Sequence, residues 1–146
     1  MYLSQLVIPI MSAQGGGNIV NVASISGITA DSNGTLYGAS KAGVINLTKY
    51  IATQTGKKNI RCNAVAPGLI LTPAALNNLN EEVRKIFLGQ CATPYLGEPQ
   101  DVAATIRLFS LRRCTLHYRT DHSSRWRIDN TQSDNKLSIK RILSSY

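Results

Sequence analysis

Two short apolar runs, separated by a long helical stretch, constrain the fold of this chain more than any other feature. The first run is NIVNVAS, at residues 18–24, and the second is NIRCNAVAPG, at residues 59–68. Both are rich in β-branched or small apolar residues and end at Ser or Pro-Gly, which is typical of buried parallel strands. A strand, a helix and a strand in this order predict an α/β fold with a parallel sheet and right-handed crossovers.

The stretch between the two runs predicts a long helix from residue 36 to about residue 54. Its apolar residues Val44, Leu47 and Ile51 recur at spacings of three and four, so we expect one buried stripe along the helix. Gly56 stands where a C-terminal cap is expected.

Other helices are expected on either side of this unit. Residues 2–14 form one helix, which the glycines at 15–17 end before the first strand. Asn80 is suited to cap a helix that begins with EEVRKIFL, because its side chain can accept a hydrogen bond from the first turn. A further helix is expected over residues 100–107.

The positive charge of the chain is unevenly spread. Residues 1–107 hold eight Lys or Arg against five Asp or Glu, a balance of +3, whereas residues 108–146 hold eight against three, a balance of +5. Most of the excess positive charge therefore lies after residue 107, and we expect this basic tail, residues 108–146, to be disordered or weakly structured. The tail lacks the motifs of nucleic-acid-binding modules, so no nucleic-acid partner is expected.

The cysteines and the N-terminal residues indicate the cellular compartment of the protein. Cys62, Cys91 and Cys114 are odd in number and widely scattered, so we expect free thiols in a reducing cytosol and no metal site. No Lys or Arg precedes Lys41, so the apolar start lacks the basic region of a secretion signal. No stretch approaches the roughly 18 apolar residues of a membrane span, and we expect a cytoplasmic protein without a membrane partner.

Tyr37 and Lys41 stand four residues apart, in the sequence YGASK at the start of the predicted long helix. This spacing puts both side chains on one face. A phenol with a pKa of about 10 is a poor acid–base catalyst at neutral pH, and a neighbouring ammonium favours its phenolate form. Ser24 lies at the carboxyl end of the first strand, where ligands bind in open parallel sheets. The alternative to a catalytic site is that Tyr37 and Lys41 form an exposed helical pair.

The combination resembles the short-chain dehydrogenase/reductase family, especially members similar to 3-oxoacyl carrier-protein reductases. The matching pieces are GGGNIVNVAS, YGASKAG, NAVAPGLILTP and GEPQDVA, in the family's order and spacing over residues 1–107. The resemblance implies the C-terminal half of a Rossmann-like domain, with a partial parallel sheet and flanking helices. It also implies an oxidoreductase that uses NAD or NADP to interconvert an alcohol and a ketone.

The resemblance implies roles for individual residues. Ser24 would orient the substrate, Tyr37 would donate or accept the proton, and Lys41 would lower the pKa of the tyrosine and bind the nicotinamide ribose. Four more residues would surround the nicotinamide: Pro67, Gly68, Ile70 and Thr72.

Three other polar residues of the same region are given different roles. Ser26 competes with Ser24 for the hydroxyl role, but its spacing to Tyr37 fits the family pattern less well. Asn63 resembles the family's strand asparagine, for which we expect a structural role. Tyr50, on the long helix, is expected to pack against its neighbours.

Two departures from the family pattern affect the expected function. The family begins with a strand, a glycine-rich turn and a helix that cradle the pyrophosphate, and this sequence contains none of them. After residue 107 the family continues with segments resembling FLASDDA, YITGQ and VDGG. Residues 108–127 can encode that ending when each codon is read from its second base, so we hypothesise a frame change close to codons 107–108.

Three interpretations of function follow. The chain is an NAD(P)-dependent oxidoreductase, or a catalytically inert fragment of one, or a basic module that binds nucleic acid or an anionic surface. Because only two of the family's strands are represented, we expect marginal folding. The resemblance implies that a homo-oligomer would form through helix 36–54.

Overall fold

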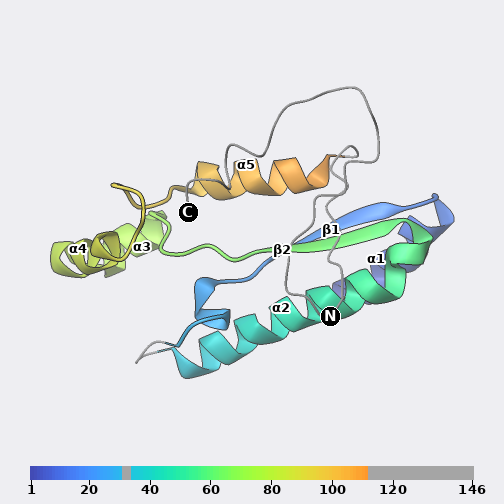
Figure 1. The fold of residues 1–146 in the computed structure, drawn as a ribbon, viewed down its shortest axis with the longest axis horizontal. Helices are drawn as coiled ribbons and strands as arrows, with labels where there is room; N and C mark the ends of the chain where they lie inside the picture. Colours follow the sequence, from blue (N-terminus) through green and yellow to red (C-terminus); the bar gives the residue numbers. More distant parts are fainter. Residues whose placement is uncertain (31–33, 112–146) are drawn as a thin grey trace.

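A computed structural model of the protein describes residues 1–30 and 34–111. The frame change and the disorder predicted for the tail therefore fall mainly on residues outside the described ranges. No helix within those ranges is both long and apolar enough to cross a membrane. The elements follow in the order α1 (Tyr2–Ala13), β1 (Gly17–Val22), η1 (Ile25–Gly27), α2 (Thr35–Thr55), η2 (Gly56–Lys58), β2 (Ile60–Val65), α3 (Pro73–Asn78), α4 (Glu81–Gly89) and α5 (Pro99–Ser110) (Figure 1).

The predicted α/β arrangement with parallel strands is confirmed. β1 and β2 form the sheet of the described residues, with Gly17 opposite Ile60 and Val22 opposite Val65. Helices cover both faces of this pair, because α1 and α2 lie on one side and α5 lies on the other (Figure 1). The crossover from β1 to β2 runs through α2, the long helix that the sequence predicts.

The core lies mainly between β2 and α2 and is small. Four apolar residues of the described ranges are buried, namely Ala23, Ile51, Ile60 and Cys62. The prediction that the first strand, residues 18–24, is buried holds only at its end, where Ala23 and Ser24 are buried; no residue of β1 itself is buried and Val22 is 46% exposed. The reason is that β1 has a strand neighbour on one side only among the described residues.

The buried face of α2 is more polar than the predicted stripe. Ile51 is buried as expected, but Val44 and Leu47 are only partly covered, and Thr48 and Thr55 are buried beside Ile51. Both threonine hydroxyls donate to a carbonyl one turn earlier, at 2.8 and 2.7 Å. Their burial is therefore tolerated, because each buried hydroxyl has a hydrogen-bond partner.

Glycine and asparagine mark the ends of the helices where the sequence predicts them. Gly15 and Gly16 end α1 with φ values of 85° and 140°, which favour glycine. Asn80 caps α4, where its side chain accepts a backbone N–H at 2.9 Å. Gly56 is the C-cap of α2, as predicted, with a φ of −56°, and Asn59 ends the short helix η2 in the left-handed conformation, with a φ of 57°.

The carboxyl end of α5 is tied to the sheet by side chains of both strands. Arg61 of β2 donates to the carbonyls of Phe109 and Leu111, each at 3.0 Å. Asn18 of β1 also donates to the Phe109 carbonyl, at 2.9 Å. These bonds satisfy carbonyls that have no partner within the helix, and the guanidinium charge complements the helix dipole. α5 spans Pro99–Ser110 and so includes the residues 100–107 at which the sequence predicts that a helix begins.

We expect the two described cysteines to react with a thiol reagent at very different rates. Cys62 is buried, and burial raises its pKa from 9.0 to about 11, whereas Cys91 is exposed. Since the thiolate is the reacting form, the pKa difference alone predicts labelling of Cys62 at pH 8 that is roughly 100-fold slower than for an ordinary thiol. The measurement is mass-resolved labelling of the Cys114→Ser chain.

The control for this measurement is the same chain in concentrated urea, where both thiols should react at similar rates. Equal rates in native buffer would show that the β2 and α2 core does not form.

Candidate functional site

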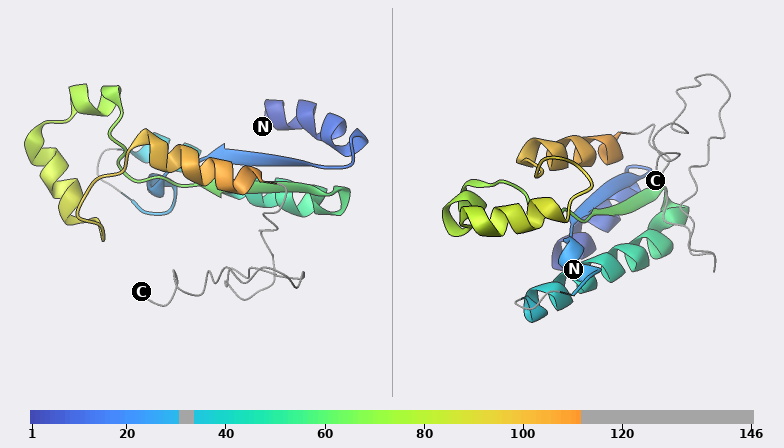
Figure 2. Two further views of the ribbon diagram at one scale, coloured as in Figure 1. Left: turned by 90° about the horizontal axis from the view of Figure 1, so that it is seen from above. Right: turned by 60° about the vertical axis from the view of Figure 1, so that its left-hand side comes forward.

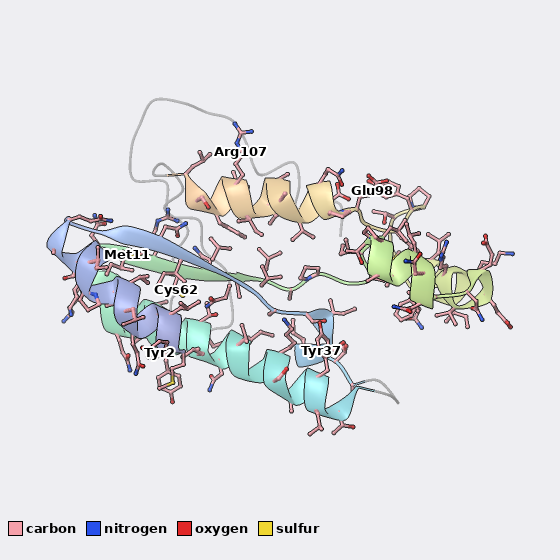
Figure 3. The ribbon with its side chains drawn as sticks, turned by 180° about the vertical axis from the view of Figure 1, so that it is seen from behind. Tyr2, Met11, Tyr37, Cys62, Glu98 and Arg107 are labelled. Atoms are coloured by element: carbon pink, nitrogen blue, oxygen red, sulfur yellow. The ribbon has the colours of Figure 1, made fainter. Side chains whose placement is uncertain are left out.

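Tyr37 and Lys41 lie together on the first turns of α2. The Nζ atom of Lys41 is 5.5 Å from the centroid of the Tyr37 ring. The same Nζ donates to the backbone carbonyl of Val22, the last residue of β1, at 3.1 Å. Tyr37 is 52% exposed, and Figure 3 shows it at the amino end of α2, close to the segment that follows β1. Lys41 therefore connects the phenol to the carboxyl end of the strand.

Ser24 lies two residues beyond Val22 and is buried. Its side chain accepts a hydrogen bond from the backbone N–H of Ser26 at 3.2 Å and so caps the short helix η1. In this bond the hydroxyl oxygen is the acceptor, so the hydroxyl proton can still be donated to another oxygen. Ser26, the competitor predicted from the sequence, contributes its backbone to the same contact.

Two glycines let the segment after β1 approach α2 closely. A Cβ on Gly27 would come within 2.7 Å of the α2 backbone at Lys41 and Ala42. A Cβ on Gly38 would come within 2.7 Å of the carbonyl oxygen of Ser26. These two contacts fix the distance between the segment that carries Ser24 and the helix that carries the phenol and the ammonium.

The ends of the two strands stay paired beyond the sheet. The N–H of Ala23 donates to the Val65 carbonyl at 2.7 Å, and the N–H of Ile25 donates to the Pro67 carbonyl at 3.0 Å. Pro67 and the following Gly68 therefore lie beside the residues that flank Ser24. The region that the family resemblance assigns to the nicotinamide begins at this edge.

Ile70 and Thr72 lie further along the same connection. Ile70 pairs with Gly97 in an isolated parallel bridge, where a Cβ on the glycine would meet Ile70 at 2.8 Å. Thr72 caps α3, since its side chain accepts from the N–H of Ala75 at 3.2 Å. The segment from β2 to α3 is thus held at both ends.

A hollow among the described residues lies next to Tyr37 and Ser24, but neither Ser24, Tyr37 nor Lys41 lines it. It measures about 210 Å³ and is lined by Ser26, Thr29, Thr35 and Gly38, among others. Ligand pockets usually measure about 300–1,000 Å³, so this hollow is too small to hold a substrate by itself.

Sequence reasoning found the three catalytic candidates but missed what positions them. The Val22 carbonyl and the two contact glycines, Gly27 and Gly38, had no predicted role, although Gly38 belongs to the YGASK motif. Tyr50, expected to pack, is exposed on the far part of α2. Asn63 is buried.

No group of three His, Cys, Asp or Glu suited to a metal ion occurs in the described ranges. For a nicotinamide ribose, the donor set fits. Lys41 uses one N–H on Val22 and has others, the Tyr37 phenol is accessible, and at Gly68 a Cβ would meet only a side-chain methyl, at 3.6 Å.

Known proteins share this sequence and arrangement. A family model described as enoyl-(acyl carrier protein) reductase matches residues 1–112. A 7alpha-hydroxysteroid dehydrogenase of Bacteroides fragilis is 99% identical over 106 residues, which are 73% of this chain and 41% of that protein. The 7alpha-hydroxysteroid dehydrogenase of Escherichia coli K12 is 40% identical over 102 residues, covering 70% of this chain and 40% of that one.

Solved structures agree with these relatives. A 7alpha-hydroxysteroid dehydrogenase complexed with NADH and 7-oxo glycochenodeoxycholic acid matches with a TM-score of 0.69 and 40% identity, over 74% of this chain and 43% of that one. A 3-oxoacyl-[acyl-carrier protein] reductase from Brucella melitensis matches with a TM-score of 0.71 and 31% identity, over 75% and 41%. The chain thus spans about two fifths of the length of the relatives it matches.

Alanine at Gly38 and at Gly43, both in α2, should have opposite effects on the free energy of unfolding. At Gly38 the added Cβ meets the Ser26 carbonyl, and such overpacking costs about 1–3 kcal/mol. At Gly43 nothing lies within 4 Å, and replacing a helical glycine by alanine should stabilise the protein by about 0.5–1 kcal/mol. Urea unfolding followed by circular dichroism measures both.

The Gly43→Ala variant is the matched control because it makes the same change on the same helix. A Gly38→Ala chain as stable as Gly43→Ala would show that the segment after β1 does not press against α2.

Proposed function

Because this chain belongs to the short-chain dehydrogenase/reductase family, we propose that Ser24, Tyr37 and Lys41 perform the acid–base chemistry of an NAD(P)-dependent oxidoreductase that interconverts an alcohol and a ketone. One observation carries the proposal. The Lys41 ammonium lies 5.5 Å from the Tyr37 ring centroid and is held there by the Val22 carbonyl. A phenol and an ammonium are thereby fixed at the carboxyl end of a parallel strand, where ligands bind in this type of sheet.

Tyr37 is the group that moves the proton. During reduction its hydroxyl donates a proton to the carbonyl oxygen of the ketone, and during oxidation its oxygen accepts the proton of the alcohol. A bound nicotinamide supplies or accepts the hydride at the carbon atom. The exposed half of the Tyr37 side chain lets the phenol oxygen reach a substrate without any movement of α2.

Lys41 and Ser24 assist this transfer in different ways. The positive charge of Lys41 stabilises negative charge that develops on the phenol oxygen during the transfer. Its remaining N–H groups would bind the hydroxyls of the nicotinamide ribose. Ser24 would donate its hydroxyl proton to the substrate oxygen, because the bond from the Ser26 N–H uses only a lone pair of the hydroxyl oxygen and leaves the proton to be donated.

The proposed cofactor is a nicotinamide dinucleotide, either NAD or NADP. One similar structure contains NADH and another contains NADP at low occupancy, which supports the class but not the choice. The sequence has no G-x-G-x-x-G turn, so its residues fit the nicotinamide end of such a molecule and not its pyrophosphate.

The proposed substrate is a steroid with an oxygen at carbon 7, such as a bile acid. The support is the 99% identity to the Bacteroides fragilis 7alpha-hydroxysteroid dehydrogenase and the similarity to the structure that holds a 7-oxo bile acid. The competing interpretation is an inert fragment, and it is favoured by the span of only 41% of that relative. Association of two copies through residues 36–54 stays a prediction.

The test uses the complete 146-residue chain and measures NADH oxidation in the presence of a 7-oxo bile acid. The chain is assayed alone and after refolding together with the part of the Bacteroides relative that lies outside the matched segment. We expect turnover in the second case, and Tyr37→Phe should lower it by about 10²–10⁴-fold because the proton donor is lost.

Tyr50→Phe is the matched control, since it removes a hydroxyl from the same helix at a site that is 60% exposed. Its rate should stay within about twofold of the original, as expected for a surface substitution with no mechanistic role. Turnover by neither preparation would establish the inert fragment. Turnover that survives Tyr37→Phe would remove the proposed proton donor.

For the basic tail we propose that residues after about 107 are translated in a shifted frame and have no selected function. The support is that the 99% identity to the Bacteroides protein extends over 106 residues, or 73% of the chain. The measurement is the coding DNA after codon 107. Read one base out of frame, it should spell a segment resembling FLASDDA followed by YITGQ, and any other translation would end the proposal.

A further inference from the structure

Asn21 carries a polar side chain on the face of β1 that α2 covers. Its Nδ2 atom donates to the Thr48 hydroxyl of α2 at 2.9 Å and to the Cys62 Sγ of β2 at 3.7 Å. Both acceptors are buried, since Thr48 is 5% and Cys62 is 2% exposed. One amide of β1 therefore contacts the helix and the neighbouring strand inside the core.

The bond between Asn21 and Thr48 has a defined direction. The Thr48 hydroxyl donates its own proton to the Val44 carbonyl at 2.8 Å, so its oxygen is left to accept the amide N–H. The bonds thus run without a break from Asn21 through Thr48 to Val44. Hydrogen bonds in such a chain strengthen one another.

The alternation of side chains along β1 explains why Asn21 faces α2. Asn18 points to the other face of the sheet, where it donates to the Phe109 carbonyl of α5. Asn21 lies three residues later, and successive strand residues point to opposite faces. An amide that faces a buried helix surface is costly unless it is hydrogen-bonded, and the bonds to Thr48 and Cys62 offset this cost.

Asn21 and the adjacent Val22 hold α2 at two places. The Val22 carbonyl accepts from Lys41 at 3.1 Å, and the Asn21 amide binds Thr48, seven residues later on the helix. Seven residues are nearly two helical turns, so both attachments lie on one face of α2, about 10 Å apart. α2 runs back along the strand pair, and its amino end lies beside the carboxyl end of β1 (Figure 1 and the left view of Figure 2).

Apolar packing alone does not set the position of α2 along β1. Of the two strands, α2 packs mainly on β2. Burial of apolar surface also has no preferred direction, whereas a hydrogen bond weakens steeply when its length or angle changes. Ser24 follows β1 and not β2, so the bond from Asn21 relates the helix to the strand that carries the candidate serine.

We propose that Asn21 is a positioning residue for the candidate active site. Through Thr48 it sets the position of α2 along β1, and it thereby places Tyr37 and Lys41 relative to Ser24. Tyr37 and Lys41 precede Thr48 by about three and two helical turns, so all three lie on one face of α2. This inference rests on the proposed function, since Asn21 acts only through these groups. A misplacement of about 1 Å can lower a catalytic rate by about 10²-fold.

Thr48→Val and Thr55→Val are matched variants on the same helix. Each removes a buried hydroxyl that donates to a carbonyl one turn earlier, at 2.8 and 2.7 Å. The Thr48 hydroxyl also accepts from Asn21 of β1, whereas the Thr55 hydroxyl also donates to the Ile60 carbonyl of β2 at 3.3 Å. Both variants should lose similar stability, but only Thr48→Val releases α2 from β1.

The position of α2 is measured by NMR on the complete chain, without catalysis. A Cβ on Gly27 would lie 2.7 Å from the backbone nitrogen of Ala42, so an α-proton of Gly27 lies close to the Ala42 amide proton. The nuclear Overhauser cross-peak between these protons weakens steeply with distance. We expect Thr48→Val and Asn21→Leu to weaken it severalfold and Thr55→Val to leave it unchanged.

Turnover is measured after each variant is refolded with the part of the Bacteroides fragilis relative outside the matched segment, and rates are expressed per folded molecule. Thr48→Val and Asn21→Leu should lower kcat by about 10–100-fold with little change in KM, because the substrate still binds while the proton donor is displaced. The double variant should be no slower than either single one, since both remove the same bond. Thr48→Ser keeps the hydroxyl and should restore most of the rate, and Thr55→Val should leave it unchanged.

Three results would overturn the proposal. Equal effects of Thr48→Val and Thr55→Val would indicate general loosening of the core. An unchanged cross-peak in both Thr48→Val and Asn21→Leu would show that the bond does not hold α2. A weakened cross-peak with full turnover would show that the chemistry tolerates the shift.

Failure of the proposed function gives a different result. The refolded original chain would then show no turnover, while the cross-peak would still report whether Asn21 holds α2 in place. If Thr48→Val does not fold, Asn21→Leu removes the same bond from the strand side and decides the question.

Discussion

The parallel pairing of β1 with β2 is the interaction on which the rest of the structure depends. It does not stop with the sheet, because Ala23 and Ile25 continue the hydrogen bonds to the β2 side as far as Pro67. Ser24 lies between those two donors, so its position is set by the pairing on both sides. Lys41 donates a hydrogen bond to the last carbonyl of β1, so the position of α2 is tied to the same strand. Loss of register between the strands would therefore displace all three candidate groups at once.

The sequence predicted those parts of the molecule in which local and global preferences agree. Local sequence patterns were enough to predict both strands, the long helix between them and the turn at Gly15. These patterns are apolar runs and the Gly, Pro or Ser residues that end them. Tyr37 and Lys41 could be paired because helical spacing alone puts them on one face. The contact of Gly27 with the α2 backbone depends on how two segments meet, and no local pattern contains that information.

The errors of prediction have a common cause. Burial of β1 and of Val44 was inferred from apolar character, but burial also requires a neighbour that covers the residue. The pair of strands in the described residues supplies too few neighbours, and Thr48 and Thr55 of α2 are buried together with Ile51 and are hydrogen-bonded to residues of the sheet. The apolar residues of β1 and α2 are those expected in a wide sheet, and a sheet of two strands leaves many of them partly exposed.

The bonds from Arg61 and Asn18 to the end of α5 determine where the chain leaves the described fold. Asn18 lies near the amino end of β1 and Ser24 just past its carboxyl end, so the exit point after Leu111 is about 20 Å from the phenol side of the sheet, at about 3.3 Å per residue. A fluorescent label or affinity handle joined at Leu111 would be attached at the opposite end of β1 from Ser24, and so at a distance from the three candidate groups.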